Sequence, residues 1–239
     1  MSMLIFQRCT RMLQTLLQVL PALLLTACAT QVEVTGHFPE PLRQPLPFDG
    51  TLVLEERLQN STYRAPHGKT VEVAIGAAQS RMFETVAPRL FQSFQVSDDL
   101  SSALAQRPDL TLLPELREFQ IATPDDTQLK IFEVWLRYLI QVYDRNGQLL
   151  VTWPLAAYGK TQNQFMKSDE DALNQAAMVA LRDAGARLAL EFEQEPLIQR
   201  WIQQTLYQQR VTEQAGNTGP TPDTPTASAA SEATESGVR

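Results

Sequence analysis

The feature that most constrains the fold is a long run of alternating residues followed by a tight-turn signal. Between Gln128 and Tyr143 apolar side chains recur at every second position, from Phe132 to Val142. Alternation of this length predicts a strand with one buried face. Asp144-Arg145-Asn146-Gly147 comes next, and Asn-Gly is the strongest short hairpin signal. We therefore expect an antiparallel hairpin whose second strand runs from Gln148 to about Tyr158.

Other segments supply further strands and helices around this hairpin. The predicted strands are Thr51–Leu58, Lys69–Ile75 and Asp109–Leu113, the last one resuming over Glu115–Ile121 after Pro114. The order β-β-α-β-β-β-α-α links strands by hairpins more often than by helices. It predicts an α+β fold, with a mixed or mainly antiparallel sheet of about four or five strands and helices on one face.

Three helices are expected from apolar spacing. The first follows Gly76 and continues to about Phe94, with Phe83, Val86, Leu90 and Phe94 on one face, and Pro88 predicts a kink or break inside it. The second begins with the capping-box-like Ser168 and Asp171 and ends before Pro196. Its stripe contains Ala177 and Ala184, which would allow close packing on a sheet. A shorter amphipathic helix covers Leu197 to about Gln209.

The N-terminal 27 residues have the layout of a secretory signal. Arg8 and Arg11 precede a mainly apolar stretch from Met12 to Leu25, and the small residues Thr26 and Ala27 follow. The uninterrupted apolar run, Val19–Leu25, is far shorter than the roughly 20 residues that a membrane-spanning helix needs. Residues 1–27 are therefore predicted to be a signal peptide.

Leu25-Thr26-Ala27-Cys28 resembles the lipobox of bacterial lipoproteins, in which two small residues precede an obligatory cysteine. The resemblance implies cleavage between Ala27 and Cys28, a diacylglyceryl thioether on Cys28, and acylation of the new amino group. Several acyl chains, at roughly 0.8 kcal/mol per buried methylene, make a durable anchor. Ala29, where an Asp would retain a lipoprotein in the inner membrane of many Gram-negative bacteria, favours the outer membrane. The alternatives are an uncleaved anchor, or an ordinary signal with an incidental cysteine.

Composition suggests how the rest of the chain is divided. Residues 28–49 hold Pro39, Pro41, Pro45 and Pro47 and are predicted to be an extended tether. Residues 50–209 suit a single α+β domain, which can bury a core without disulfides. Residues 210–239 contain almost no large apolar side chain and are predicted to be a disordered tail.

Net charge argues against nucleic acid as a partner. The chain carries −7, and removal of residues 1–27 takes away Arg8 and Arg11 but no acid, which leaves −9. No basic cluster with interleaved aromatic residues is present, although phosphate binding needs one. An acidic body is also not drawn to anionic lipid by charge, so a membrane-bound form would depend on the acyl anchor.

The residues that carry catalysis are scarce. Both cysteines, Cys9 and Cys28, lie in the first 28 residues, and His67 is the only histidine outside the predicted tether. Paired acids, such as Asp98-Asp99 and Asp125-Asp126, fit solvated turns and helix starts. We predict no catalytic residue, no metal site and no cofactor beyond the covalent lipid. An envelope hydrolase stays as an alternative if His67 lies in a cleft beside a serine or carboxylate.

Three aromatic residues of the hairpin, Trp135, Tyr143 and Trp153, are candidates for a binding surface if they share one face. The alternative is that they belong to the core or lie under the helices. Sequence alone does not decide which face of the hairpin is buried.

The lipobox, the Pro-rich stretch, and a Trp-bearing hairpin after Asp109–Leu116 together resemble small outer-membrane lipoproteins of Gram-negative bacteria. The domain is similar to those of lipopolysaccharide-assembly, transport-auxiliary and curli-channel lipoproteins. This resemblance implies a periplasm-facing accessory or interaction module in envelope assembly or transport, whose partners are the bilayer and unidentified envelope proteins. The alternative is a carrier that holds a lipid or acyl chain in an unfilled apolar cavity between the sheet and the helices.

Overall fold

A computed structural model describes residues 30–64, 71–127, 129–162 and 168–217. The chain divides into two compact units, one ending at Ile198 and the other beginning at Gln199. The strands are β1 (Thr30–Glu33), β2 (Leu46–Val53), β3 (Thr62–Arg64), β4 (Val71–Ala74), β5 (Phe91–Ser97), β6 (Leu110–Ala122), β7 (Ile131–Asp144) and β8 (Leu149–Gln162). The helices are α2 (Glu56–Gln59), α3 (Gly76–Val86), α4 (Leu100–Ala105), α5 (Pro124–Thr127), α6 (Asp169–Glu191) and α7 (Pro196–Asn217), with 3₁₀ turns at Ala87–Leu90 (η2) and Phe192–Gln194 (η3).

Two sheets form the first unit, which confirms the predicted α+β class. The larger has the order β5-β2-β6-β7-β8, and the smaller the order β1-β4-β3. In the larger sheet β2 runs parallel to both neighbours, whereas β6, β7 and β8 form an antiparallel meander. In the smaller sheet β4 runs parallel to β1 and antiparallel to β3, so both sheets are mixed.

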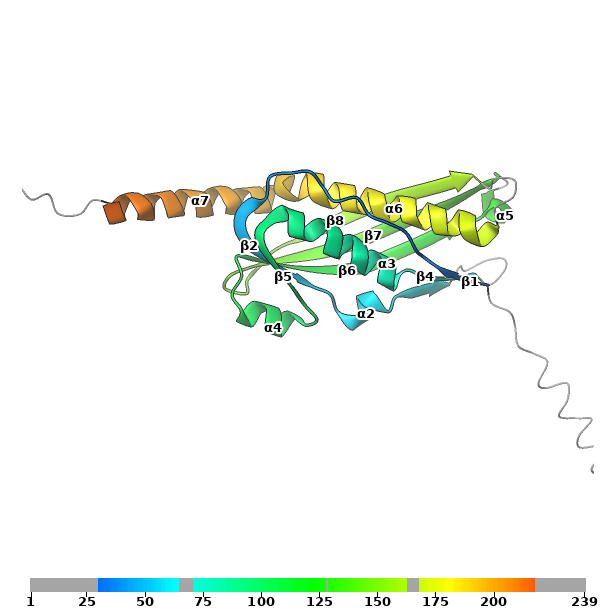
Figure 1. The fold of residues 1–239 in the computed structure, drawn as a ribbon, viewed down its shortest axis with the longest axis horizontal. Helices are drawn as coiled ribbons and strands as arrows, with labels where there is room; N and C mark the ends of the chain where they lie inside the picture. The colour runs from blue at the N-terminus through cyan, green and yellow to red at the C-terminus, as the bar shows by residue number, and fades with distance from the viewer. Residues whose placement is uncertain (1–29, 65–70, 128, 163–167, 218–239) are drawn as a thin grey trace, which may run out of the picture. The chain divides into compact units, whose positions relative to one another are not determined.

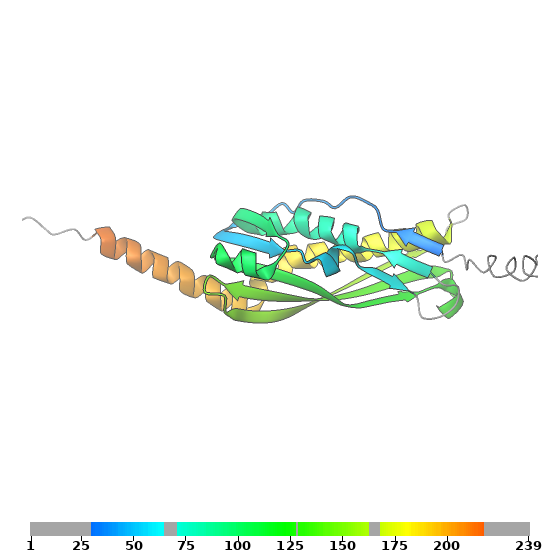
Figure 2. The ribbon, with the colours of Figure 1, turned by 90° about the horizontal axis from the view of Figure 1, so that it is seen from below.

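Helices α3 and α6 lie against one face of the larger sheet (Figures 1 and 2). Even-numbered side chains of β7 and odd-numbered side chains of β8 point to this face, and Tyr138, Leu136 and Leu155 are fully buried there. We call the opposite side of β6, β7 and β8 the open face. α4 covers one end of it, where Ala103 packs with Leu113 and Tyr143.

The predicted hairpin is present as β7 and β8. Asp144 N–H donates to Gln148 O at 2.9 Å, and Gly147 N–H donates to Asp144 O at 2.9 Å. Gly147 has φ of +76°, so a three-residue loop with a left-handed glycine closes the turn. One residue is bulged next to the turn, after which the register stays regular from Val142 to Ile131.

The predicted tether over residues 28–49 is wrong for residues 30–49, because these residues are packed into the first unit. β1 pairs in parallel with β4, and β2 already begins at Leu46. Between them residues 34–45, called the strap, run along α6 with Val34 and Phe38 buried. The prolines do keep this stretch extended, but Val34 and Phe38, which precede them, supply buried contacts that a solvated tether would lack.

The first predicted helix is too long. The observed helix α3 ends at Val86, and residues 91–97 form strand β5. Pro88 lies in η2 because a proline has no N–H and its ring clashes with the preceding turn of a helix. Phe94 therefore belongs to β5, where Gly50 of β2 lies opposite it. Phe83 and Val86 share the buried side of α3 as their spacing predicts, and Leu90, which lies after the break in η2, is buried as well.

Smaller boundary corrections have local causes. β6 continues through Pro114 because β2 pairs only with Leu110–Leu112, so no second strand needs the missing N–H. The predicted strand Thr51–Leu58 ends at Val53, and Leu58 lies in α2. The predicted single domain reaching residue 209 is divided at Ile198.

The C-terminal helices agree with the sequence in their start signals. Ser168 caps α6, where its Oγ accepts from Asp171 N–H at 3.1 Å, and Pro196 begins α7. α7 extends to Asn217, so the predicted disordered tail cannot begin at residue 210. The predicted signal peptide, Ala27, Cys28, His67 and the end of the predicted tail all lie outside the described residues.

Candidate functional site

A groove of about 350 Å³ lies on the open face, away from the end that α4 covers. Strands β6, β7 and β8 form its floor, and α6 supplies one wall at the β8 edge. We call it the open-face groove; its side chains that reach the open face or this wall are Glu118, Gln120, Trp135, Arg137, Ala156, Tyr158, Asp183 and Arg187. A one-residue bulge between Leu116 and Glu118 keeps Glu118 and Gln120 on the same face as Glu115.

Trp135 is the central side chain of the groove, and it is 38% exposed. It lies opposite Tyr158 in the β7–β8 register, and the two ring centroids are 5.3 Å apart with an interplanar angle of 40°. Tyr158 donates its hydroxyl hydrogen to Glu133, and this bond is the main reason why its pKa is raised. A tryptophan is thus held in place by its neighbour while one side stays open to solvent.

The charged residues of the groove occur as opposite pairs. Arg137 pairs with Glu118 across β7 and β6, and Arg187 Nε lies 3.2 Å from Asp183 Oδ2 on α6. All four side chains are at least one-third exposed, so these pairs contribute little to stability. The residues that line the groove include two cations and two anions and so have no net charge. Glu191, beside the groove, gives Arg187 a second carboxylate partner at 3.2 Å.

The edge of β8 beside the groove is protected against pairing with another strand. Tyr158 N–H points outward and donates to Asp183 Oδ2 at 3.0 Å. Pro154 has the same parity along β8, so the missing N–H falls on the outward side as well. Both features are typical of edge strands that resist strand addition.

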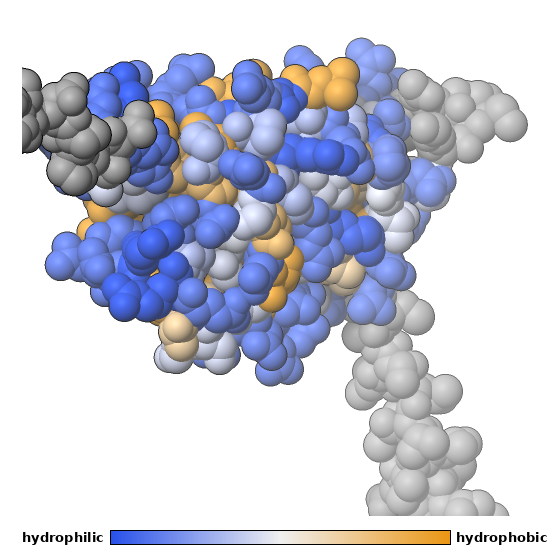
Figure 3. All heavy atoms as spheres, turned by 60° about the vertical axis from the view of Figure 1, so that its left-hand side comes forward, coloured by the Kyte–Doolittle hydropathy of each residue, from blue (hydrophilic) through white to orange (hydrophobic). Residues whose placement is uncertain are grey.

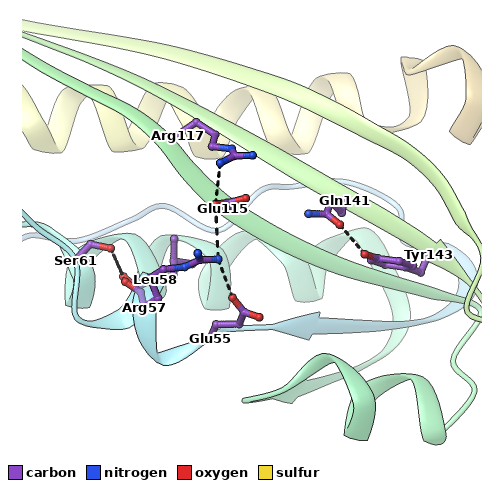
Figure 4. Close-up of polar contacts among 8 residues, drawn as sticks. All are labelled: Glu55, Arg57, Leu58, Ser61, Glu115, Arg117, Gln141 and Tyr143. Atoms are coloured by element: carbon purple, nitrogen blue, oxygen red, sulfur yellow. Dashed lines mark hydrogen bonds and ion pairs between the residues drawn. The ribbon is translucent and has the colours of Figure 1, made fainter.

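A second polar cluster lies on the open face between α2 and β6 (Figure 4). Arg57 lies 3.2 Å from Glu55 and 3.6 Å from Glu115, and Arg117 lies 3.3 Å from the same Glu115 oxygen. Ser61 Oγ donates to the backbone oxygens of Arg57 and Leu58. The serine hydrogen is therefore held by carbonyl groups and not by a general base, so this cluster is an exposed ion-pair network.

The three predicted aromatic residues do not form one surface. Trp153 points to the core face, is 8% exposed, and packs on Phe192 with 6.3 Å between ring centroids. Tyr143 shares the open face with Trp135 but lies eight residues away, roughly 26 Å along the strand, and is partly covered by α4. Only Trp135 stays at a groove, and its partner there, Tyr158, was not among the candidates.

The register of the hairpin turn is the signal that points to Tyr158. Counting back from Asp144 opposite Gln148, and allowing for the one-residue bulge next to the turn, places Trp135 opposite Tyr158, as observed. Asp183 and Arg187 carry no comparable signal, because they approach the groove only through the packing of α6 on the edge of β8.

A second groove of about 270 Å³ lies between the strap and α6, and its walls are mainly apolar. Leu42 and Leu190 stand at its rim, exposed by 103% and 69%. Arg43 reaches Ala189 O and Glu193 through its terminal nitrogens, whereas its Nε is buried and has no hydrogen-bond partner among the described residues. Burial also lowers the pKa of Arg43. We call this the strap groove.

Three other kinds of functional feature could mark the rest of the described residues: a large hydrophobic patch, a metal site and a membrane-spanning helix. On the face drawn in Figure 3, hydrophobic residues appear as separate groups among hydrophilic ones. Within the described ranges, no three His, Cys, Asp or Glu side chains gather closely enough to hold a metal ion. None of the helices described here combines the length and apolar character needed to cross a membrane.

No protein-family model matches the chain, and no curated protein sequence matches it. Among solved structures, it is similar to a Xanthomonas campestris protein of the DUF330 family, at 8% identity and a TM-score of 0.48 over 67% of this chain and 92% of the other. It is also similar to a minor lipoprotein from Acinetobacter baumannii, at 14% identity and a TM-score of 0.35 over 62% and 92%. An uncharacterised lipoprotein B from Nitrosomonas europaea gives 16% identity and a TM-score of 0.29 over 66% and 97%. At these values the comparisons assign no family and no site residue to this chain.

Proposed function

We propose that this chain is a lipoprotein anchored by Cys28 in the outer membrane of a Gram-negative bacterium, facing the periplasm. It serves there as a non-catalytic accessory module in envelope assembly or transport. The observation that carries the proposal is the lipobox Leu25-Thr26-Ala27-Cys28 at the end of a signal-like segment. Acylation of Cys28 supplies the membrane affinity that an acidic chain does not obtain from charge.

The start of β1 sharpens this proposal. Thr30 is the second residue after Cys28, and two residues span at most about 7 Å. The smaller sheet would therefore lie next to the bilayer surface, and the domain would not be held away from it on a tether. A domain placed so close is suited to receiving a membrane component or a membrane-bound partner.

Replacing Cys28 by alanine tests the anchor. In the wild type we expect loss of residues 1–27, a mass increase corresponding to acyl chains, and flotation with the outer membrane; Cys28→Ala should remain unprocessed and unlipidated. Intact mass spectrometry and membrane fractionation measure these outcomes. Cys9→Ala is the matched control, because Cys9 lies in the segment that is removed, and it should behave as the wild type does. Identical behaviour of wild type and Cys28→Ala would contradict the proposal.

The non-catalytic role is supported by how the polar groups of the open face are engaged. Arg137 and Arg187 pair with carboxylates, and the Ser61 hydroxyl is held by backbone oxygens. Such an arrangement favours recognition over bond cleavage, which needs a nucleophile beside a base. A hydrolase using His67 would instead require that histidine to stand within hydrogen-bond reach of a serine or carboxylate.

The strap groove supports a second candidate function, carriage of a fatty acyl chain. The space between the larger sheet and the helices is filled by side chains such as Phe83, Met82 and Leu181, so the predicted cavity does not lie there. The strap groove is apolar, and the buried Nε–H of Arg43 offers a donor to a carboxylate or ester head.

A fluorescent fatty acid tests this second candidate. If the strap groove holds the chain, Ala189→Glu should weaken binding at least tenfold by placing a charge among apolar walls. Ala186→Ser, a small polar change at the same groove, should have a much smaller effect. Equal binding by the wild type and Ala189→Glu would exclude the strap groove as the acyl site.

A further inference from the structure

We propose that the open-face groove binds a neutral, polyhydroxylated ligand, namely a short stretch of an oligosaccharide chain. The groove consists entirely of described residues, and its binding can be measured without the lipid anchor. The inference is therefore independent of the proposed attachment through Cys28. Four properties of the groove lead to it: an exposed indole, zero net charge, mixed hydrogen-bonding groups, and a protected strand edge.

The exposed indole provides an apolar platform. Trp135 is 38% exposed although it is the fifth residue of a 14-residue strand, and the centroid of the Tyr158 ring lies 5.3 Å from that of the indole. The face of an indole carries partial negative charge and attracts the polarised C–H groups on one side of a pyranose ring. The position is fixed before binding, so little side-chain entropy is lost when a ring stacks on it.

The balance of charge selects against an ionic ligand. Arg137 pairs with Glu118, and Arg187 pairs with both Asp183 and Glu191. A phosphate or carboxylate would have to displace an existing anion, because both cations are already neutralised. A neutral ligand meets no such competition.

The polar groups around Trp135 match the chemistry of hydroxyls. Guanidinium groups only donate, ionised carboxylates only accept, and the amide of Gln120 does both. A sugar hydroxyl both donates and accepts, so neighbouring hydroxyls can bridge an arginine and a carboxylate of one ion pair. Hydrogen bonds to charged partners are stronger than those between neutral groups.

Two further details define the kind of occupant. Ala156 lies opposite Arg137 and is exposed. Its small side chain leaves space for a ligand above the floor of the groove, between Trp135 and the β8 edge. Pro154 and the bond from Tyr158 N–H to Asp183 block the same edge against an added strand. A peptide docked by backbone pairing is therefore disfavoured, and a ligand that binds through side chains is favoured.

Retention on an array of neutral and anionic oligosaccharides, followed by calorimetric titration of the retained glycans, tests the inference. The full chain should be used, in a detergent without a sugar headgroup. We expect a neutral oligosaccharide to bind, Trp135→Ala to weaken binding at least tenfold, and Trp135→Phe to weaken it less because a ring is kept. Ala156→Ile should also weaken binding by filling the floor, although a β-branched residue suits an exposed strand position.

Tyr207→Ala is the matched control, since Tyr207 is an aromatic residue exposed by 64% on α7 and outside the groove. It should bind as the wild type does. The inference is overturned if no neutral oligosaccharide is retained, or if Trp135→Ala and Ala156→Ile bind as tightly as the wild type. Competition by inorganic phosphate at millimolar concentration would show an anion site, which would also overturn it.

Discussion

Gly159→Ala should lower the free energy of unfolding by roughly 3 kcal/mol or more, or prevent folding altogether. Gly159 lies in β8 where α6 crosses it, and a Cβ atom there would lie 2.2 Å from Ala176 O and 2.3 Å from Ala180 N. Both atoms belong to the helix backbone, so no side chain can move aside. The whole of α6 would have to shift away from the sheet, and its buried contacts with β7 and β8 would be lost.

Gly185→Ala is the control for this prediction. Gly185 also lies in α6, but the nearest atoms to an added Cβ are side-chain atoms of Val86 and Met82, at 3.2 and 3.3 Å. Those side chains can adjust, and alanine is favoured over glycine inside a helix by about 1 kcal/mol. Denaturant midpoints of the two variants should therefore differ widely. If Gly159→Ala were as stable as Gly185→Ala, the close contact of α6 with β8 would be wrong.

The contrast between the hairpin and the strap shows which parts of the fold are encoded locally. Alternation and the Asn146-Gly147 signal specify β7 and β8 within one stretch of sequence, and they were predicted. β1 and β5 pair in parallel with β4 and β2, whose residues lie some forty positions away, as in Thr30 with Val71 and Leu46 with Phe91. No residue adjacent in the sequence specifies such a pairing. The prolines of the strap therefore suggest a tether where the structure has packed residues, and the spacing of Phe94 suggests a helix where the structure has a strand.

The open-face groove likewise has one part that the hairpin sequence specifies and another that depends on how α6 packs on the sheet. Trp135 is identified from the hairpin, and its partner Tyr158 follows from the turn register once the bulge next to the turn is included. Trp153 follows the alternative kept open in the sequence, because its parity on β8 places it on the core face. The contribution of α6 to the groove depends on where the helix crosses the sheet, which Gly159 controls but sequence periodicity does not show.

Gln79→Met should lower the free energy of unfolding by about 2–4 kcal/mol, because it leaves two buried groups, Leu58 O and the Tyr138 hydroxyl, without the hydrogen bonds that Gln79 makes to them. Gln79 is fully buried on α3; its Nε2 donates to Leu58 O at 2.6 Å, and its Oε1 accepts from the Tyr138 hydroxyl at 2.9 Å. Methionine has a similar shape but makes neither bond. Tyr138→Phe removes only one of the two bonds and should cost less, about 1–2 kcal/mol.

The same hydroxyl predicts a dependence of stability on alkaline pH. Burial raises the pKa of Tyr138 well above its ordinary value of 10.0. Above pH 10 the unfolded chain loses this proton while the folded chain retains it, so the unfolded state binds fewer protons. Stability must then fall as the pH rises, at up to about 1.4 kcal/mol per pH unit from this group, and the contribution is fully present below pH 10.

Unfolding of the wild type and Tyr138→Phe between pH 8 and 11 measures this contribution. The other tyrosines are common to both chains, so their titration cancels in the difference. The wild type should be more stable by a constant amount up to about pH 10, and its advantage should shrink above that value. Stability curves that stay parallel to pH 11 would mean that the Tyr138 hydroxyl reaches water in the folded protein, and the buried Gln79–Tyr138 bond between α3 and β7 would then be incorrect.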